Sequence, residues 1–337
     1  MRSLLPRFRT QPLLAALLAT AALAVAPTAH ADDKKEWKIS HSAHGDITSE
    51  HHIVAWVFKN YLEDHSDTLS ARIYPSSALG DERAVFEAMQ LGAGATCAVA
   101  GTAILNNFSK RVGVIDLPFL WKDYDHMNRA LDGKVGDEIA ADLEKSGFKV
   151  LAWTTNWGAR NIVTANKAIN TPEDLKGLKI RTIQSPVYVE TINSMGANAT
   201  PMSFGEVYTS MQTGVLDGFE HGSAVVVTNK FYEVAKNLAI TNHFLGPAVF
   251  ACSLNEWNKL SDAQKKVVMD GAKLAGDVNR ALAPIREQEA LEFLRAKGMT
   301  ITTVDTTEFR EKAKGLQDKI AKDVGGTELL TEIRAVQ

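Results

Sequence analysis

The fold is decided by residues 166–222, which read NKAINTPEDLKGLKIRTIQSPVYVETINSMGANATPMSFGEVYTSMQTGVLDGFEHG. Residues 171–174, TPED, predict a helix start, because a capping hydroxyl precedes a proline and two acids at the positive end of the helix dipole. Residues 178–183 alternate as in a β-strand until Pro186 breaks the pattern. A helix follows and ends at Gly196. This alternation of strands and helices predicts an α/β architecture.

The rest of the quoted stretch predicts one more helix and one more strand. Residues 203–206, SFGE, have the pattern of a capping box, in which Ser203 caps the helix and Glu206 reaches back to the cap. The helix ends at Gly214, and residues 215–219 have the pattern of a strand.

The same alternation runs through the first half of the chain. Strand patterns occupy residues 37–42, 69–74, 96–100, 112–117 and 148–153. Helix patterns fall at residues 53–62 and 81–91, and Asp81 can cap the second of them. The nearly all-apolar run at residues 96–100 is typical of the middle of a parallel sheet. A βαβ series of this kind implies helices on both faces of the sheet.

The last third of the chain contains a long helical pattern. Ser261 and Gln264 can cap it, and it continues to about residue 297. Pro284 lies inside the pattern and should either kink the helix or split it in two. A long helix beside two α/β halves suits a connection that crosses between two lobes.

The N-terminus has the pattern of a cleavable export signal. Three arginines within the first nine residues precede an apolar run at residues 13–25, and Ala29 and Ala31 supply the small residues that a signal peptidase reads. The run is shorter than the roughly 20 residues that span a membrane. We therefore predict a signal peptide at residues 1–31 and a periplasmic mature protein, with an uncleaved anchor as the alternative.

Composition excludes several classes of protein. The chain has 337 residues, 45% of them hydrophobic and 23% charged, which is typical of a soluble globular protein with two domains or lobes. A net charge of −3 without basic runs argues against nucleic-acid binding. The nucleophile-elbow, phosphate-loop, zinc-helix and dinucleotide motifs are missing, so we predict a binding protein that is not an enzyme and needs no cofactor.

A polar cluster near the mature N-terminus keeps one enzyme alternative open. It contains His41, His44, Glu50, His51 and His52. Such side chains can hold zinc, as in a secreted metal-dependent hydrolase. Adjacent residues on a helix, however, point about 100° apart. We therefore predict no metal and expect His41 to line a cleft at the end of the first strand.

The only two cysteines are far apart in the sequence. Cys97 and Cys252 can pair in an oxidising compartment, or they can be two small buried residues in strands. The sequence leaves both interpretations open.

Several separated motifs resemble one family of receptors. Besides residues 166–222, they are YPSSALGDERAVFEAM at 74–89, DLPFL at 116–120 and KFYEVAKNLAITNH at 230–243. Together they resemble the solute receptors of tripartite ATP-independent periplasmic (TRAP) transporters, the DctP-type family. The resemblance implies a two-lobe periplasmic binding protein fold of type II-like character. The expected lobes are residues 32–157 with 247–286 and residues 158–246 with 287–337.

The resemblance also implies the function. Such a receptor captures a small organic acid in the cleft between its lobes and delivers it to membrane permease subunits. Nothing in the sequence requires more than a monomer. A sensor that reports to a signalling kinase would have the same sequence features.

Two arginines match the family's carboxylate-binding residues. Arg181 ends a predicted strand, and its planar guanidinium can donate two parallel hydrogen bonds to one carboxylate. Without the resemblance, a solvated surface arginine would be the simpler interpretation. Arg160 matches a second family arginine, which contacts the same acid or orients its neighbour.

Four further residues are candidates for the cleft. Phe204 matches an aromatic that packs on the ligand, with core packing as the alternative. Trp157 can wall the pocket or pack in the core, and Glu82 can face the cleft or simply stabilise a helix start. His221 replaces an asparagine of the sialic acid receptors and, if protonated, would attract a second acid group.

One further departure concerns the size of the ligand. Ala100 replaces an acid of the sialic acid receptors. We therefore expect an acid smaller than sialic acid, and an apolar or aromatic portion fits the sequence.

Overall fold

The structure is a computed structural model, and it describes residues 34–337, without the side chains of residues 156 and 157. The predicted signal peptide and its cleavage site after Ala31 lie outside the described residues.

A nine-stranded mixed sheet organises the described residues. Its strands follow the order β2-β1-β3-β8-β4-β7-β5-β6, and β9 pairs with β8. The strands are β1 (Lys35–Ser40), β2 (Leu69–Tyr74), β3 (Cys97–Gly101), β4 (Phe148–Thr164), β5 (Lys179–Thr182), β6 (Asn198–Pro201), β7 (Gly218–Gly222), β8 (Asn237–Ser253) and β9 (Thr300–Thr303).

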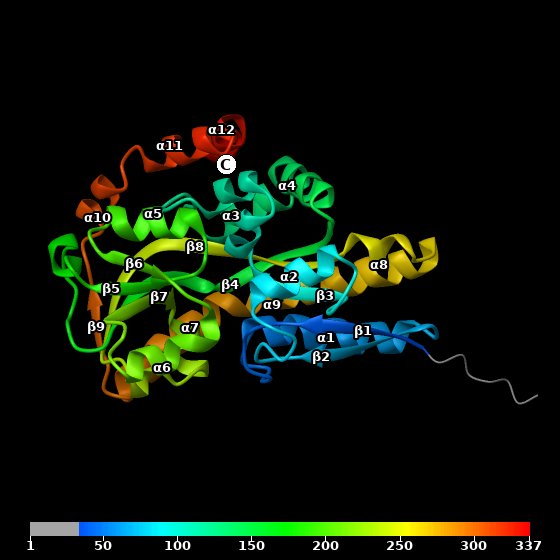
Figure 1. Cartoon of the computed structure of the whole chain (residues 1–337), viewed down its shortest axis with the longest axis horizontal. Helices are drawn as coiled ribbons and strands as arrows, with labels where there is room; N and C mark the ends of the chain where they lie inside the picture. Colours follow the sequence, from blue (N-terminus) through cyan, green and yellow to red (C-terminus); the bar gives the residue numbers. More distant parts are fainter. Residues whose placement is uncertain (1–33) are drawn as a thin grey trace, which may run out of the picture. The chain divides into compact units, whose positions relative to one another are not determined.

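Two long antiparallel strands join the two ends of this sheet. β4 and β8 pair along most of their length, with β1–β3 on one side of them and β5–β7 on the other (Figure 1). Pairing is parallel within each end, β1 with β2 and β3, and β5 with β6 and β7. Below, we call these two ends the β1–β3 side and the β5–β7 side.

Helices cover both faces of the sheet, as the βαβ pattern predicted. The α-helices are α1 (Glu50–His65), α2 (Glu82–Gln90), α3 (Tyr124–Leu131), α4 (Lys134–Lys145), α5 (Pro186–Ser194), α6 (Val207–Gln212), α7 (Ser223–Thr228), α8 (Leu254–Asn258), α9 (Asp262–Ala296), α10 (Thr307–Lys312), α11 (Leu316–Asp323) and α12 (Thr327–Ala335). Short 3-10 helices are η1 (Thr102–Asn107), η2 (Lys110–Asp116), η3 (Pro172–Leu175), η4 (Phe204–Glu206) and η5 (Phe231–Glu233).

The alternation of side chains along β3 separates two buried clusters. Cys97 and Val99 pack with α1 and α9, whereas Ala98 and Ala100 pack with α2, α3 and α4 on the opposite face. The C-terminal helices α11 and α12 join the second cluster (Figure 1). The division of the chain into lobes at 157–158, 246–247 and 286–287 remains a prediction.

Three local predictions were wrong. Residues 112–117 form no strand, and residues 112–116 belong to η2. The prediction failed because a short, fully buried apolar run has the same sequence pattern in a strand and in a helix. The predicted cap at Ser203 is absent, since its hydroxyl donates to the carboxylate of Glu206 and not to the backbone. β3 is not inside a parallel sheet, because it pairs antiparallel with β8.

The long C-terminal helix begins where the sequence predicted. The Ser261 hydroxyl accepts from the Gln264 N–H and the Gln264 side chain accepts from the Ser261 N–H, which makes α9 start with a capping box. α9 continues through Pro284 as one helix of 35 residues, so the predicted split is wrong. A kink at Pro284 remains a prediction.

The two cysteines are paired. Cys97 on β3 and Cys252 on β8 lie directly opposite each other in the sheet and form a disulfide. Of the two interpretations that the sequence left open, the structure therefore has the disulfide.

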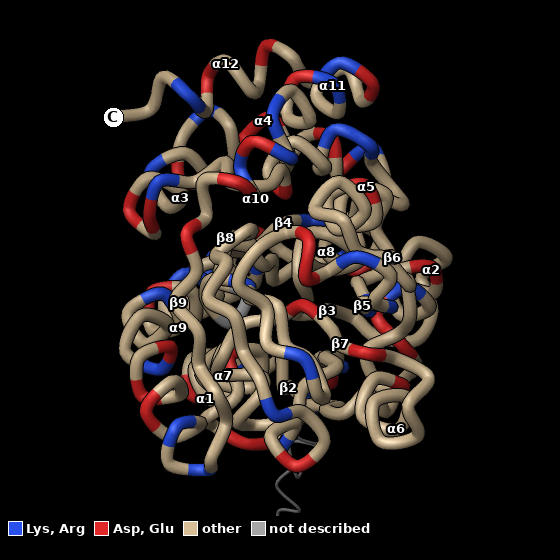
Figure 2. Tube along the Cα trace, turned by 90° about the vertical axis from the view of Figure 1, so that its left-hand side faces the viewer, with Lys and Arg blue, Asp and Glu red and all other residues tan. Residues whose placement is uncertain are grey.

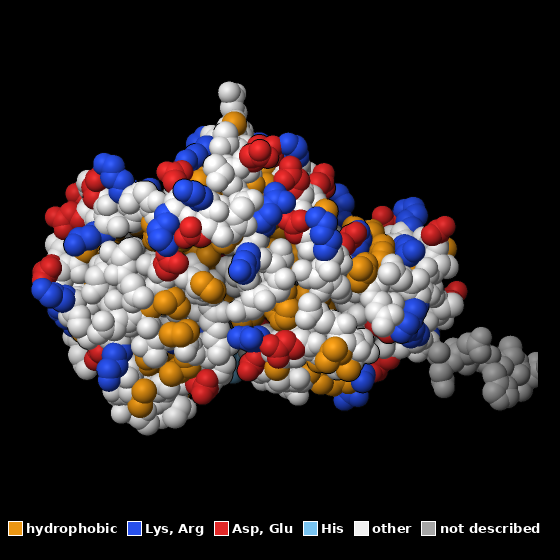
Figure 3. Space-filling view, turned by 45° about the horizontal axis from the view of Figure 1, so that its top comes forward, with side chains coloured by type: hydrophobic (Ala, Val, Ile, Leu, Met, Phe, Trp, Pro, Cys, Tyr) orange, Lys and Arg blue, Asp and Glu red, His pale blue; other side chains and the backbone are white. Residues whose placement is uncertain are grey.

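Surface charge is mixed in sign. Lys and Arg lie among Asp and Glu along α4, α11 and α12 (Figure 2), where Lys134 pairs with Glu332 and Arg334 with Asp318. The face in Figure 3 likewise shows both signs interspersed with apolar side chains.

Candidate ligand-binding cleft

Arg181 is a buried cation without an acidic partner. It lies on β5 with 2% of its surface exposed, and its Nε and Nη2 donate to the carbonyl oxygen of Met202 at 3.0 and 2.6 Å. No carboxylate of the described residues lies within ion-pair distance of it. Burial lowers the pKa of Arg181 to about 10. The guanidinium therefore remains charged at neutral pH, with its charge uncompensated.

Arg160 lies close by on β4 and is fully paired. Its Nε and Nη2 donate to the two carboxylate oxygens of Glu220 on β7 at 2.5 and 2.8 Å. Nη2 also donates to the backbone oxygen of Glu220, and the Tyr188 ring lies 5.3 Å from the guanidinium carbon. This bidentate pair is the geometry in which a buried guanidinium and carboxylate neutralise each other.

Glu220 also faces a histidine. The Nε2 atom of His243 lies 3.8 Å from the Glu220 carboxylate. Burial raises the pKa of Glu220, but Arg160 and His243 together outweigh this effect and the pKa is lowered. Glu220 is therefore ionised, as the pairing with Arg160 requires.

Glu82 brings a carboxylate to the cleft from the other side. It is the first residue of α2, on the β1–β3 side, and accepts a hydrogen bond of 2.7 Å from the Ser42 hydroxyl. The pKa of Glu82 is raised, because burial outweighs the bond from Ser42 and the charges of Arg181 and Arg160, which act in the opposite direction. Glu82 thus faces both arginines across the cleft without pairing with either.

His221 is neutral in this environment. Burial, helped by Arg160 and Arg181, lowers its pKa well below the ordinary value. Its Nδ1 accepts the backbone N–H of Gly222 at 2.9 Å, so the ring proton is on Nε2. The protonated form that would attract a second acid group is therefore not the form present at neutral pH.

His41 is also neutral, and it belongs to a histidine pair. It follows β1, and its Nε2 lies 3.0 Å from Nδ1 of His52. Burial and the neighbouring His52 lower its pKa to about 3. Within residues 34–337, no three His, Cys, Asp or Glu side chains are grouped so that they could hold a metal ion.

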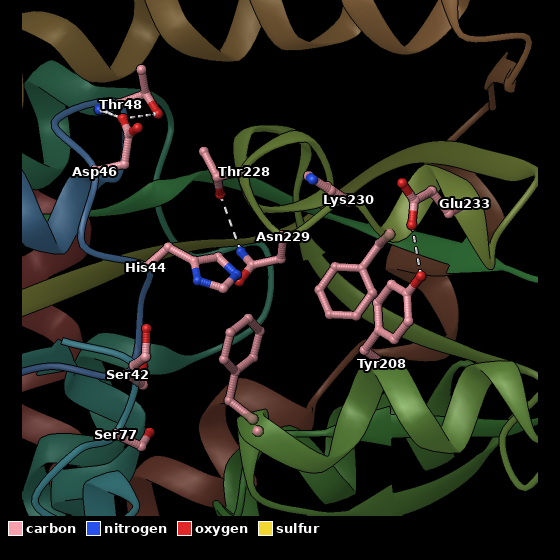
Figure 4. Close-up of a pocket in the computed structure, with 14 residues that line it drawn as sticks. Ser42, His44, Asp46, Thr48, Ser77, Tyr208, Thr228, Asn229, Lys230 and Glu233 are labelled. Carbon is pink, nitrogen blue, oxygen red and sulfur yellow. Dashed lines mark hydrogen bonds between the residues drawn. The ribbon is translucent and has the colours of Figure 1, made fainter.

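Phe204 lies between Arg181 and the open part of the cleft. Its ring centroid is 5.9 Å from the guanidinium carbon of Arg181 and 5.5 Å from the His221 ring. Phe204 lines both the narrow recess that holds Arg181 and Glu82 and an open cavity of about 720 Å³. Figure 4 shows this open cavity, with Ser42 and Ser77 on one side and Tyr208 and Lys230 on the other.

Trp157 is the one predicted site residue whose side chain is not described. Its backbone belongs to β4 and leads into Gly158, which has φ +82°. A Cβ atom at Gly158 would lie 2.6 Å from Oε2 of Glu287 and 2.8 Å from the Tyr124 hydroxyl, so the chain needs a glycine here.

The sequence profile of the DctP family, described as "Bacterial extracellular solute-binding protein, family 7", matches residues 39–323. The chain belongs to this family. Among similar DctP-type proteins is the 2,3-diketo-L-gulonate-binding periplasmic protein YiaO of Escherichia coli, 34% identical over 86% of this chain and 89% of that protein. Another is the sialic acid-binding periplasmic protein SiaP of Vibrio cholerae, 32% identical over 78% of this chain and 82% of that protein.

A solved DctP-type structure shares the fold. The TRAP periplasmic solute binding protein from Polaromonas sp. JS666, bound to D-erythronate, covers 90% of this chain and 99% of its own with a TM-score of 0.86 and 32% identity. The predicted two-lobe α/β fold is thereby confirmed. No helix within residues 34–337 is long and apolar enough to cross a membrane.

Sequence reasoning missed part of this DctP-type cleft. Glu220 and Tyr188, which hold Arg160, were not predicted, and neither were Tyr208 and Lys230 in the open cavity. The sequence offered no local signal for Glu220, because the predicted strand ended at residue 219 and the surrounding residues 218–222, GFEHG, are not an apolar run.

Proposed function

We propose that this chain is the periplasmic solute receptor of a TRAP transporter and that it captures a small organic acid by its carboxylate. The observation that carries the proposal is the buried, uncompensated charge of Arg181. Burying a cation without a partner is costly, and a ligand carboxylate that accepts two hydrogen bonds from the guanidinium offsets this cost. The Nη1 atom of Arg181 donates to no acceptor among the described residues and is available for such a bond.

The ligand that fits the cleft best is a hydroxylated monocarboxylic acid. Glu82 offers an acceptor for ligand hydroxyl groups, whereas a second ligand carboxylate would be repelled by an ionised Glu82. Solved relatives hold D-erythronate, D-glucuronate and galacturonate, which are all acids of this kind. Ala100 supports an acid smaller than sialic acid. A ligand with an apolar or aromatic portion is also compatible with this position.

Binding would shift the receptor from open to closed lobes. The ligand would contact Arg181, Arg160, Phe204 and His221 on the β5–β7 side and residues near His41 and Glu82 on the β1–β3 side, so it favours the state in which both sets are close. We further propose that a leader of residues 1–31 directs export, that the mature protein is a monomer, and that its partners are membrane permease subunits. The metal-dependent hydrolase gains no support from the relatives.

A thermal-shift screen of residues 32–337 tests the proposal. The panel contains D-erythronate, D-galacturonate, D-glucuronate, a dicarboxylate and an aromatic acid, each with wild type, Arg181→Met and Arg129→Met. A ligand at 100 times its Kd stabilises the protein by about 2.7 kcal/mol, which is several degrees for a protein of this size. We expect the shift to be lost in Arg181→Met and kept in Arg129→Met, because Arg129 is exposed on α3.

Two results would count against the proposal. Stabilisation that survives Arg181→Met would mean that the carboxylate is held elsewhere. Stabilisation by neutral sugars alone, with no response to any acid, would contradict an organic-acid receptor altogether.

A further inference from the structure

Asp116 is a buried carboxyl group that lacks the partners of a carboxylate. It ends η2, has 2% of its surface exposed, and its Oδ1 accepts from the Thr102 hydroxyl at 2.8 Å. Its Oδ2 is buried and has no hydrogen-bond partner among residues 34–337. No basic side chain of these residues lies within ion-pair distance. A carboxylate buried in this way, with one hydrogen bond and no ion pair, is strongly disfavoured.

The hydrogen-bond geometry around Thr102 is satisfied only if one more proton is present. Thr102 Oγ1 lies 2.8 Å from Asp116 Oδ1 and 3.0 Å from the carbonyl oxygen of Pro247, and a threonine hydroxyl has a single proton for these two acceptors. If Asp116 carries a proton, it can donate to Thr102, which then donates to Pro247. With an ionised Asp116, one proton must serve both contacts.

The charged surroundings agree with a neutral acid. Burial raises the pKa of Asp116 to about 8, although the bond from Thr102 and the charge of Arg160 act against this rise. The ionisable groups that act on Asp116 are Arg160 of β4 and Tyr188 of α5, with Glu220 of β7 and His243 of β8 behind Arg160. At the start of η2, Arg111 pairs with Glu138 and Asp142 of α4.

We propose that Asp116 is a neutral carboxylic acid in the ligand-free protein and that its proton sets the affinity of the cleft for an anion. The inference rests on the proposed function, because it adds a residue that controls the same carboxylate site from behind. With Asp116 neutral, the charges of Arg160, Arg181, Glu220 and Glu82 sum to zero, although Arg181 itself has no ion-pair partner. With Asp116 ionised, the same group carries an excess negative charge that opposes an anionic ligand.

The sign of the pH dependence follows from this charge balance. A ligand carboxylate adds a negative charge to these groups and so disfavours ionised Asp116, which gives Asp116 a higher pKa in the bound state. Binding above about pH 8 therefore takes up a proton, and affinity falls with rising pH by up to about tenfold per pH unit. Below pH 8, the titration of Asp116 does not change the affinity. Arg181, with a pKa of about 10, stays mostly charged up to about pH 9 and begins to lose its charge above it, in wild type and Asp116→Asn alike.

The first experiment needs no ligand. The carboxyl-carbon NMR signal of Asp116 in 13C-labelled protein, residues 32–337, is followed from pH 4 to 9.5 and identified by its absence in Asp116→Asn. We expect a midpoint near pH 8. A midpoint near the ordinary value of about 4 overturns the inference, whether or not any acid binds. Thr102→Val, which removes the hydroxyl, should move the midpoint, whereas Thr102→Ser should not.

The second experiment measures the Kd of D-galacturonate and D-erythronate from pH 6 to 9.5. We expect wild type to lose affinity above pH 8, and Asp116→Asn, which mimics the neutral acid and can donate to Thr102, to keep it. Equal pH profiles for the two proteins overturn the inference. If no acid binds at any pH while Asp116 titrates near 8, the proposed function fails and the protonation of Asp116 stands.

Discussion

Arg160 and Arg181 lie on β4 and β5 of the same sheet and are both almost completely buried, yet only Arg160 has an ion-pair partner. Arg160 has a bidentate partner in Glu220 and an aromatic ring against its face, so its position and charge are fixed by the protein. Arg181 is oriented by a backbone carbonyl and by the Phe204 ring, which fix its position but give it no ion-pair partner. On the proposed function, Glu220 holds Arg160 in place, and Arg181 is the arginine that would gain more from a ligand carboxylate.

This contrast has a physical reason. A buried ion pair needs no further partner, because the two charges offset each other's loss of solvation. A buried cation without an anion is stabilised by any anion that enters. The electrostatic stabilisation that the folded protein does not give this cation is therefore gained when the ligand binds. The same type of residue can thus contribute to stability on β4 and to binding on β5, with only β7 between the two strands.

The largest expected effect comes from breaking the Arg160 pair. Glu220→Gln leaves a fully buried guanidinium without its anion, and loss of one partner of a buried pair costs about 3–5 kcal/mol. Arg181→Met, which removes an unpaired cation and nearly keeps the volume, should change stability by about 1 kcal/mol, since it loses hydrogen bonds to one carbonyl and a ring contact but no ion pair. Urea unfolding of both variants without ligand measures the difference. Equal losses of stability would remove the distinction between the two arginines.

A second prediction concerns the acid on the opposite wall. Glu82→Gln removes the charged acceptor that faces Arg181 but keeps the size of the side chain. Affinity for hydroxylated acids such as D-erythronate should fall by about tenfold or more, because a hydrogen bond to a charged group contributes about 1.5–3 kcal/mol. Affinity for a dicarboxylate should rise, since the repulsion from Glu82 is gone. Isothermal titration of both ligands checks this.

The control for this variant lies on the same helix. Glu87→Gln changes an exposed acid of α2 that pairs with Arg83 at 2.9 Å on the surface, so it should leave both affinities unchanged. If Glu82→Gln behaves like Glu87→Gln, then Glu82 takes no part in ligand selection.

Local sequence patterns were sufficient for much of the fold. Residues 69–74 were predicted as a strand with its actual limits, because alternation and the following Pro75 are both local signals. The cap of α9 at Ser261 and that of α2 at Asp81 were predicted for the same reason. Such features depend on a few neighbouring residues, and these are visible in the sequence.

Features that depend on distant partners were not predictable in this way. The Arg160–Glu220 pair joins residues 60 positions apart, and the Cys97–Cys252 disulfide joins residues 155 positions apart. The run at 112–117 was mistaken for a strand because its burial comes from several helices, including α11 and α12 near the end of the chain. The family resemblance identified both arginines, but only the structure shows that one of them is already paired.

The smallest expected effect tests how Arg181 is held. The ring of Phe204 lies 5.9 Å from its guanidinium carbon, and an interaction of this kind contributes about 0.5–1 kcal/mol at partly exposed sites. Phe204→Leu should therefore weaken binding of D-galacturonate by roughly two- to fivefold. Phe293→Leu, on the exposed side of α9 outside the cleft, should leave binding unchanged. A loss of a hundredfold in Phe204→Leu would instead mean that the ring contacts the ligand over a large area, and that the uncompensated charge of Arg181 is not the main source of affinity.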